Sequence, residues 1–307
     1  MIVYKDGSWL PIEETNVSVM DHGFLYGVGL FETFRTYNGV PYLFHDHLKR
    51  LRDGLESVYI EWSHTDEELH ELVTEALKKN GLTDGVIRLN VTAGISNWGL
   101  PTETYRAPSL LLFTRPVPDF TTENKDAVVL ERRRNTPEGD TRLKSHHYLN
   151  NLLGKRELGN QLDVEGIFLT EEGFVAEGLV SNIFWIKEDV VHTPSISTGI
   201  LSGVTRKFIL HLCSLLELEV KEGKFPLEEL MQADEVFITN STQEIIKISK
   251  LDDTVFPALA SSRLACLKDL YNQGTNQQLL SYQQVKKVDW KNGKYELISN
   301  EVDMRTI

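Results

Sequence analysis

Cysteine, positive charge and long apolar runs are all scarce in this sequence. Cys213 and Cys266 are the two cysteines, 53 residues apart in apolar stretches. They cannot build a disulfide framework or a zinc cluster, and we expect them to be buried thiols in a reducing cytoplasm. The sequence has 32 basic and 45 acidic residues, and the net charge of -13 disfavours nucleic acid and anionic membranes as partners. No apolar run reaches the roughly 18 residues of a membrane span, and no signal-like core follows Met1. These absences predict a cytoplasmic protein.

The length predicts two domains. At roughly 150 residues per domain, 307 residues are enough for two, and an apolar content of 41% is ordinary for a folded chain. Residues 116–119 read Pro-Val-Pro-Asp and are the best linker candidate, because two prolines fix an extended path. We therefore predict a small N-terminal domain at 1–117 and a larger domain at 118–307 that includes a C-terminal extension.

Strand and helix signals are mixed before this linker. Thr65 and Glu68 form a capping box ahead of helical apolar spacing that ends at Gly81. Apolar, β-branched and aromatic residues predict strands at 2–4, 31–37, 87–93 and 109–114. This mixture predicts an α+β fold.

Short strand signals dominate after the linker. We predict helices at 143–158 and 204–218, and strands at 127–132, 166–170, 174–177, 181–186, 190–193 and 235–239, the middle four as two hairpins. Asn292-Gly293 is typical of a hairpin turn between residues 286 and 299. Residues 277–307 are open to three interpretations, a strand pair, an appendage at a dimer edge or a tail, and the sequence does not decide among them.

Two segments have the chemistry of an anion site. Residues 199–206 form a glycine-bracketed loop that leads into a helix, whose first N–H groups and dipole attract phosphate. Residues 238–244 run from a strand into consecutive hydroxyl side chains, which can donate to phosphate oxygens. The alternatives are an ordinary strand-to-helix turn and a capped turn.

Two ionisable residues stand in apolar surroundings. Lys144 begins the predicted helix at 143–158, where desolvation would lower its pKa, as a nucleophilic lysine requires. A solvated surface lysine is the alternative. Glu177 lies on an apolar strand, where a carboxylate is costly to bury without a partner such as a protonated ring nitrogen.

The order of these segments resembles the fold-type IV pyridoxal-phosphate enzymes, which include branched-chain and D-amino-acid aminotransferases and 4-amino-4-deoxychorismate lyase. The resemblance covers about residues 1–250 and rests on five segments in the family's order: 47–51, Lys144, Glu177 with 181–184, 199–206 and 239–244. Within the family, residues 21–33, 134–139 and 143–151 most resemble the lyases of Bacillus-type bacteria.

The resemblance implies a homodimer of two-domain subunits, with a β-barrel-like core in the larger domain and pyridoxal 5'-phosphate in the cleft between the domains. Lys144 would bind the cofactor covalently, and Glu177 would keep its pyridine nitrogen protonated. The resemblance implies a further set of cofactor-binding residues: Leu201 against the ring, and Arg50, Val204, Thr205, Ser241 and Thr242 around the phosphate.

Two reactions on a small-molecule substrate are open, and a third alternative is a pyridoxal-phosphate-binding protein without turnover or a non-enzymatic module. A lyase would convert 4-amino-4-deoxychorismate to 4-aminobenzoate and pyruvate, with Lys144 as the base. An aminotransferase would act on branched-chain or D-amino acids. However, residues 95–100 lack the Arg-x-His pair of the D-amino-acid enzymes, and Phe31 stands where those enzymes often have Tyr. Thr33 and Arg35 are substrate-side candidates only because their strand should face the substrate.

Histidine and arginine clusters have simpler explanations. Residues 45–47 and 146–147 offer imidazole and carboxylate groups, but no third and fourth ligand follows at a recognisable spacing, so we predict no metal site. Residues 132–134 are three consecutive arginines, which we interpret as a solvated strand end or part of the entry for an anionic substrate.

Overall fold

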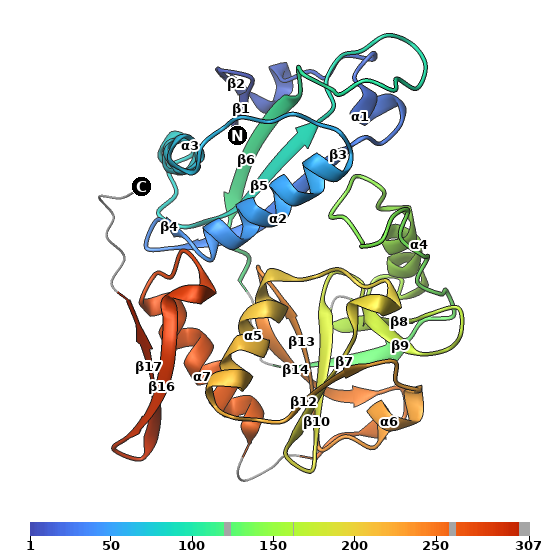
Figure 1. The fold of residues 1–307 in the computed structure, drawn as a ribbon, viewed down its shortest axis with the longest axis vertical. Helices are drawn as coiled ribbons and strands as arrows, with labels where there is room; N and C mark the ends of the chain where they lie inside the picture. The colour runs from blue at the N-terminus through green and yellow to red at the C-terminus, as the bar shows by residue number, and fades with distance from the viewer. Residues whose placement is uncertain (120–123, 162, 258–261, 301–307) are drawn as a thin grey trace.

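The computed structural model describes residues 1–119, 124–161, 163–257 and 262–300. Its N-terminal part is built on a six-stranded antiparallel sheet in the order β2-β1-β6-β5-β3-β4 (Figure 1). The strands of this sheet are β1 (Ile2–Lys5), β2 (Ser8–Pro11), β3 (Gly29–Tyr37), β4 (Val40–Pro41), β5 (Gly85–Thr92) and β6 (Ser109–Pro116). The short helix α1 (His22–Leu25) precedes β3.

Helices cover one face of this sheet and leave the other free. Helices α2 (Phe44–Ser57) and α3 (Asp66–Lys79) share a buried core with alternate residues of β3, β5 and β6. Because successive strand residues point to opposite faces, Phe31, Thr33 and Arg88 lie on the face away from this core. That second face becomes one wall of the candidate site.

The C-terminal part contains a mixed sheet of nine strands in the order β12-β11-β10-β13-β14-β7-β8-β9, with β15 beside β14. Strand β9 also approaches β10 and β11, so the sheet curls into a half-barrel. The strands of this sheet are β7 (Asn124–Val129), β8 (Val164–Leu169), β9 (Val175–Gly178), β10 (Asn182–Lys187), β11 (Val190–Pro194), β12 (Val220–Gly223), β13 (Glu235–Asn240), β14 (Glu244–Leu251) and β15 (Thr254–Val255).

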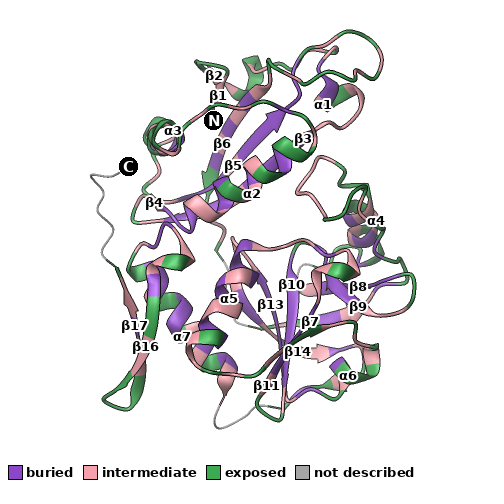
Figure 2. Cartoon of the chain, viewed as in Figure 1, coloured by how far each residue is buried: buried purple, intermediate pink, exposed green. Residues whose placement is uncertain are grey.

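Helices and a hairpin complete this part. Helices α5 (Val204–Leu215) and α7 (Arg263–Asn276) pack with Phe184 and Phe237 in one core. Figure 2 shows the strands β10 and β13, which carry these two residues, as mostly buried. The hairpin β16 (Val285–Lys291) and β17 (Lys294–Ser299) adds Val285 and Leu297 to the same core. Helices α4 (Leu149–Glu157) and α6 (Leu227–Met231) lie elsewhere around the sheet.

Most of the predicted elements are confirmed. The Thr65–Glu68 capping box begins α3, and both predicted hairpins pair as β8 with β9 and β10 with β11. Asn292 and Gly293 both have positive φ at the turn of the C-terminal hairpin, as its sequence requires. The α+β prediction with a barrel-like second sheet is therefore correct, and residues 285–299 are a strand pair. Residues 301–307 lie outside the described residues.

The predicted helix at 143–158 is wrong over its first turn and a half, because α4 begins only at Leu149. The preceding segment pairs instead with β3: the Phe31 N–H donates to the Lys144 carbonyl at 2.9 Å, and the His146 N–H donates to the Gly29 carbonyl at 3.0 Å. The strand predicted at 127–132 is shifted and ends at Val129. The helix predicted to reach residue 218 ends at Leu215.

The last strand of the first sheet ends at Pro116, and the first strand of the second sheet begins at Asn124. Residues 1–117 and 118–307 therefore remain the proposed domains.

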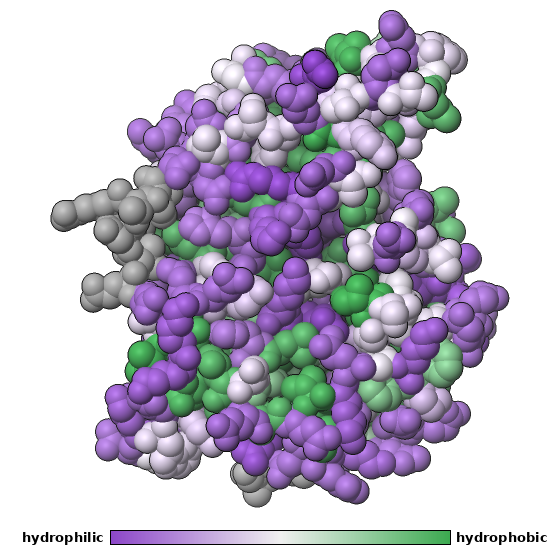
Figure 3. Space-filling model, in the orientation of Figure 1, coloured by the Kyte–Doolittle hydropathy of each residue, from purple (hydrophilic) through white to green (hydrophobic). Residues whose placement is uncertain are grey.

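The face shown in Figure 3 is mostly hydrophilic, with smaller apolar areas among the polar side chains. Among the described residues, no helix is long and apolar enough to cross a membrane.

Candidate active site

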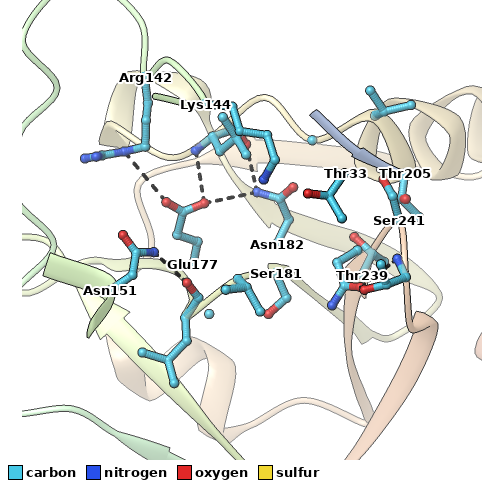
Figure 4. Close-up of a pocket in the computed structure, with 18 of the residues that line it drawn as sticks. Thr33, Arg142, Lys144, Asn151, Glu177, Ser181, Asn182, Thr205, Thr239 and Ser241 are labelled. Atoms are coloured by element: carbon cyan, nitrogen blue, oxygen red, sulfur yellow. Dashed lines mark hydrogen bonds and ion pairs between the residues drawn. The ribbon is translucent and has the colours of Figure 1, made fainter. Parts of the chain in front are cut away.

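A cavity of about 280 Å³ lies between the two sheets. The first sheet and α2 contribute Phe31, Thr33 and Arg50, while the segment before α4 contributes Lys144. The second sheet and the start of α5 supply the opposite wall, including Glu177 (Figure 4). Residues far apart in the sequence therefore meet at one site.

Lys144 is held by backbone pairing with β3 and extends its amine into this cavity. Its Nζ lies 4.8 Å from the centre of the Phe31 ring. Burial, reinforced by the charge of the Arg50 guanidinium, lowers the pKa of Lys144 to about 8. A substantial fraction of this amine is neutral near physiological pH, which suits a nucleophile or a base.

Glu177 is a buried carboxylate at the end of β9, and donors surround it. Arg134 Nε donates to it at 2.8 Å, and the Leu201 backbone N–H donates at 3.0 Å. Asn182 Nδ2 donates at 3.4 Å, and Arg142 Nε lies 3.7 Å away. Figure 4 shows Arg142, Glu177 and Asn182 gathered on one side of the cavity. This network fixes the orientation of the carboxylate.

The start of α5 offers uncapped backbone N–H groups. Gly203 is the N-cap and makes no side-chain cap bond. A Cβ at Gly203 would lie 2.0 Å from Asn182 Oδ1, so only glycine allows this close approach. Among the described residues, the buried hydroxyls of Thr205 and Thr239 find no hydrogen-bond partner. Figure 4 places both with Ser241 on the side of the cavity away from Arg142. Unpaired buried donors beside a helix N-terminus fit an anion such as phosphate.

Arg50 reaches the cavity from α2 and is fixed by a buried acid. Its Nε and Nη2 donate to the Glu32 carboxylate at 2.7 and 2.6 Å, and its Nη1 donates to the Ser202 carbonyl at 3.0 Å. His47 Nδ1 lies 2.7 Å from the same carboxylate. Burial alone would raise the pKa of Glu32, but Arg50 and His47 outweigh it and lower the pKa to about 2.

Most of the sequence-predicted site residues line this cavity: Thr33, Arg50, Lys144, Glu177, Leu201, Val204, Thr205, Ser241 and Thr242. Their roles stay predictions. Arg35 does not line it, because its guanidinium pairs with Glu244 at 2.9 Å and lies over the Tyr37 ring. The structure therefore gives no support to Arg35 as a substrate contact.

Sequence reasoning missed several lining residues, chiefly the arginines Arg88, Arg115 and Arg142. The sequence predicts Arg134 to be part of a solvated strand end or of an entry for an anionic substrate, but it is buried against Glu177, while Arg132 and Arg133 are exposed. Arg134 and Glu177 are 43 residues apart in the sequence, so no local pattern predicts that they pair. Among the described residues, no group of three or more His, Cys, Asp or Glu side chains is placed to hold a metal ion.

The family profile described as amino-transferase class IV matches residues 29–251, which include every residue of the cavity wall named above. The chain belongs to this family. The matched span begins with β3 and ends with β14, so it includes strands of both sheets that enclose the site.

Three relatives show how this member of the family compares with others. An aminodeoxychorismate lyase from Bacillus subtilis is 45% identical over 275 residues, which cover 89% of this chain and 94% of that protein. The crystal structure of 4-amino-4-deoxychorismate lyase from Pseudomonas aeruginosa superposes with a TM-score of 0.78 at 26% identity, over 87% of this chain and 97% of the other. The T.th. branched-chain amino acid aminotransferase with pyridoxamine 5'-phosphate has a TM-score of 0.79 at 24% identity, over 92% and 96% of the two chains, and shares the fold.

Proposed function

We propose that this protein is a pyridoxal-phosphate-dependent 4-amino-4-deoxychorismate lyase that releases 4-aminobenzoate and pyruvate. The observation that carries the proposal is the 45% identity, over nearly the whole of both chains, to a protein of that name. The geometry supports it, since the cavity combines a lysine of lowered pKa, an oriented carboxylate and a set of anion donors.

The residues present fit pyridoxal phosphate. The uncapped N–H groups of Val204 and Thr205, the unpaired hydroxyls of Thr205 and Thr239, and the fixed Arg50 guanidinium match a phosphate group. Ser241 and Thr242 lie on the same wall. Bound pyridoxal phosphate supplies an electron sink for the carbon from which a proton leaves.

Each protein group then has a distinct task. Lys144 would hold the cofactor covalently, and its amine would take the proton from the ring carbon that bears the substrate amine. Loss of that proton, with cleavage of the enolpyruvyl C–O bond, makes the ring aromatic and releases enolpyruvate, which takes up a proton to become pyruvate. The negative charge of Glu177 would keep the pyridine nitrogen protonated, and Arg134 and Leu201 fix the orientation of its carboxylate.

The assay that tests this function uses purified protein, pyridoxal phosphate and 4-amino-4-deoxychorismate without any 2-oxo acid. We expect fluorescent 4-aminobenzoate and pyruvate to appear in equal amounts. Strict dependence of turnover on an added 2-oxo acid contradicts the lyase and favours an aminotransferase.

We also propose that the protein works as a homodimer in the cytoplasm. The exposed apolar side chains of Leu149, Leu152 and Val180 lie together in a groove beside the site, and a second subunit would cover them. Both cysteines are free thiols, as a reducing compartment allows. Sedimentation equilibrium of the holoenzyme tests the dimer.

A further inference from the structure

Leu279 and Leu280 are neighbours in the sequence, shortly after the end of α7, but they belong to different hydrophobic cores. Leu279 lies in the core that contains α5 and α7, beside the second sheet. Leu280 lies in the core that α2 and α3 form on the first sheet. Both side chains are buried. One short segment is therefore anchored in both halves of the molecule.

The same segment pairs with the backbone at the start of α2. A helix begins with N–H groups that have no partner inside the helix, and the N-cap residue Leu43 makes no side-chain cap bond. The N–H groups of Leu43 and His45 donate instead to the carbonyls of Leu279 and Leu280, at 2.8 and 2.9 Å. Figure 1 shows the chain between α7 and β16 beside this end of α2.

Side chains add a second link to the first turn of α2. The Asp46 carboxylate accepts from the Tyr282 backbone N–H at 2.9 Å and from the Ser281 hydroxyl at 3.1 Å. The Tyr282 ring in turn lies 5.5 Å from the ring of His211 on α5, measured between centroids. We call residues 279–282 the interdomain clip, because they contact α2 on one side and α5 on the other.

The two helices joined by the clip carry separate halves of the anion site. Helix α2 carries Arg50, whereas α5 begins with the uncapped N–H groups of Val204 and Thr205. The halves meet where Arg50 Nη1 donates to the Ser202 carbonyl at 3.0 Å. Because donors on different elements bind one ligand only at a fixed separation, small movements between α2 and α5 would weaken the site.

We propose that the interdomain clip holds α2 against α5, so that Arg50 and the first N–H groups of α5 bind one phosphate group together. This inference rests on the proposed function, which supplies the phosphate as part of the cofactor. Asp46, Leu280 and Ser281 are then positioning residues, since none of them lines the cavity. A loosened clip leaves every donor present but no longer preorganised, and mobile donors bind less tightly.

The first test compares two similar cavities in one core. Leu280→Ala and Leu69→Ala each remove a buried leucine side chain from the core of the first sheet, and Leu69 lies on α3, outside the clip. We expect the dissociation constant of pyridoxal phosphate, measured by equilibrium dialysis, to rise about tenfold in Leu280→Ala and less than about twofold in Leu69→Ala. Leu280→Met keeps the volume and should restore tight binding. Urea unfolding shows whether both alanine variants lose similar stability.

The second test separates position from charge. Asp46 lies one helical turn from Arg50, so loss of its negative charge would by electrostatics alone strengthen the binding of a nearby anion. Loss of its bonds to the clip acts in the opposite direction. We expect Asp46→Ala to raise the dissociation constant of pyridoxal phosphate about three- to tenfold. Glu56→Ala removes an exposed acid of the same helix and should change the constant less than about twofold.

Two outcomes overturn the clip: equal dissociation constants in Leu280→Ala and Leu69→Ala, or a constant in Asp46→Ala that is unchanged or lower. If Leu280→Ala does not fold, the result for Asp46→Ala decides. The binding measurements need no turnover. A failed lyase assay with clip-dependent cofactor binding therefore rejects the proposed reaction alone, and lyase turnover with clip-independent binding rejects the clip alone. No binding of pyridoxal phosphate by the wild type rejects both.

Discussion

Arg50 and Arg88 line the same cavity in opposite electrostatic settings. Arg50 donates twice to the buried carboxylate of Glu32, so its position is fixed before any ligand arrives. Arg88 rests on an aromatic ring and has no acidic partner among the described residues. The two settings suit two kinds of anion. A phosphate that stays bound is held more tightly by a donor whose position is already fixed. A ligand that enters and leaves needs a donor whose N–H groups are free to bind it.

Among substitutions that leave Lys144 in place, the largest effect should follow a change at Glu177, which lines the same cavity as these two arginines. Glu177→Gln removes the charge that would hold the pyridine nitrogen protonated, while both arginines of the comparison remain. We expect turnover to fall about 10²- to 10³-fold, with the cofactor still bound. Steady-state kinetics and cofactor absorbance measure the two quantities. Glu172→Gln, in the exposed hairpin turn between β8 and β9, should change neither.

The Glu32 carboxylate tests whether Arg50 is fixed in advance. Breaking this buried pair with Glu32→Gln should lower the free energy of unfolding by about 3 kcal/mol and weaken cofactor binding. Because the pKa of Glu32 is about 2 in the folded state against 4.5 ordinarily, its stabilisation is full above pH 4.5 and is lost as the pH falls towards 2.

Urea unfolding of the wild type and Glu32→Gln at several pH values measures that stabilisation. The difference in unfolding free energy should shrink between pH 4.5 and 2. A difference that does not depend on pH contradicts the assignment to the Glu32 charge. Glu13→Gln, an exposed acid in the same part of the chain, is the control.

The lowered pKa of Lys144 predicts a pH-dependent nucleophile. Its folded-state value of about 8 lies below the ordinary 10.5, so its neutral fraction rises as the pH passes through 8. Competitive labelling of the cofactor-free protein with acetic anhydride should show a half-maximal rate for Lys144 near pH 8. The exposed Lys78 serves as the internal reference. A Lys144 midpoint above 10 argues against desolvation of this amine.

The smallest effect on catalysis is expected at Arg35, an arginine that neither binds in the cavity nor lines it. It lies outside the cavity and is held by Glu244. Arg35→Gln should change the KM for substrate less than about threefold, while the free energy of unfolding falls by about 1.5 to 3 kcal/mol, because the partly buried Glu244 carboxylate loses a charged donor. A tenfold rise in the KM for substrate would indicate that Arg35 contacts the substrate.

Local sequence patterns predicted the elements whose causes are local. The Thr65 capping box and the Asn292-Gly293 turn are examples, since neighbouring residues supply the decisive bonds and φ angles. Helix α2 has no such signal: its N-cap, Leu43, has a left-handed φ of 52° and makes no side-chain cap bond. Its start is set by distant pairing, in which Leu43 and His45 N–H groups donate to the carbonyls of Leu279 and Leu280.

In the candidate site, too, local sequence patterns predict some residues, and only the fold reveals others. Lys144 and Glu177 were found because each is an ionisable residue in an apolar stretch with a family-like context. The loss of helix before Leu149 could not be predicted, because it depends on pairing with β3, over a hundred residues away in the sequence. Arg88 and Arg142 lie on separate elements, and only the folded chain brings them to one cavity.

Covalent attachment of the cofactor to Lys144 is the central claim, and hydride trapping tests it directly. Purified protein saturated with pyridoxal phosphate is reduced with borohydride, digested and mapped by mass spectrometry. We predict one phosphopyridoxyl adduct in the wild type, on Lys144. The Lys144→Ala variant should show neither this adduct nor lyase turnover. The control Lys78→Ala, which removes an exposed lysine, should still show the adduct. No adduct, or an adduct confined to another lysine, would contradict the account.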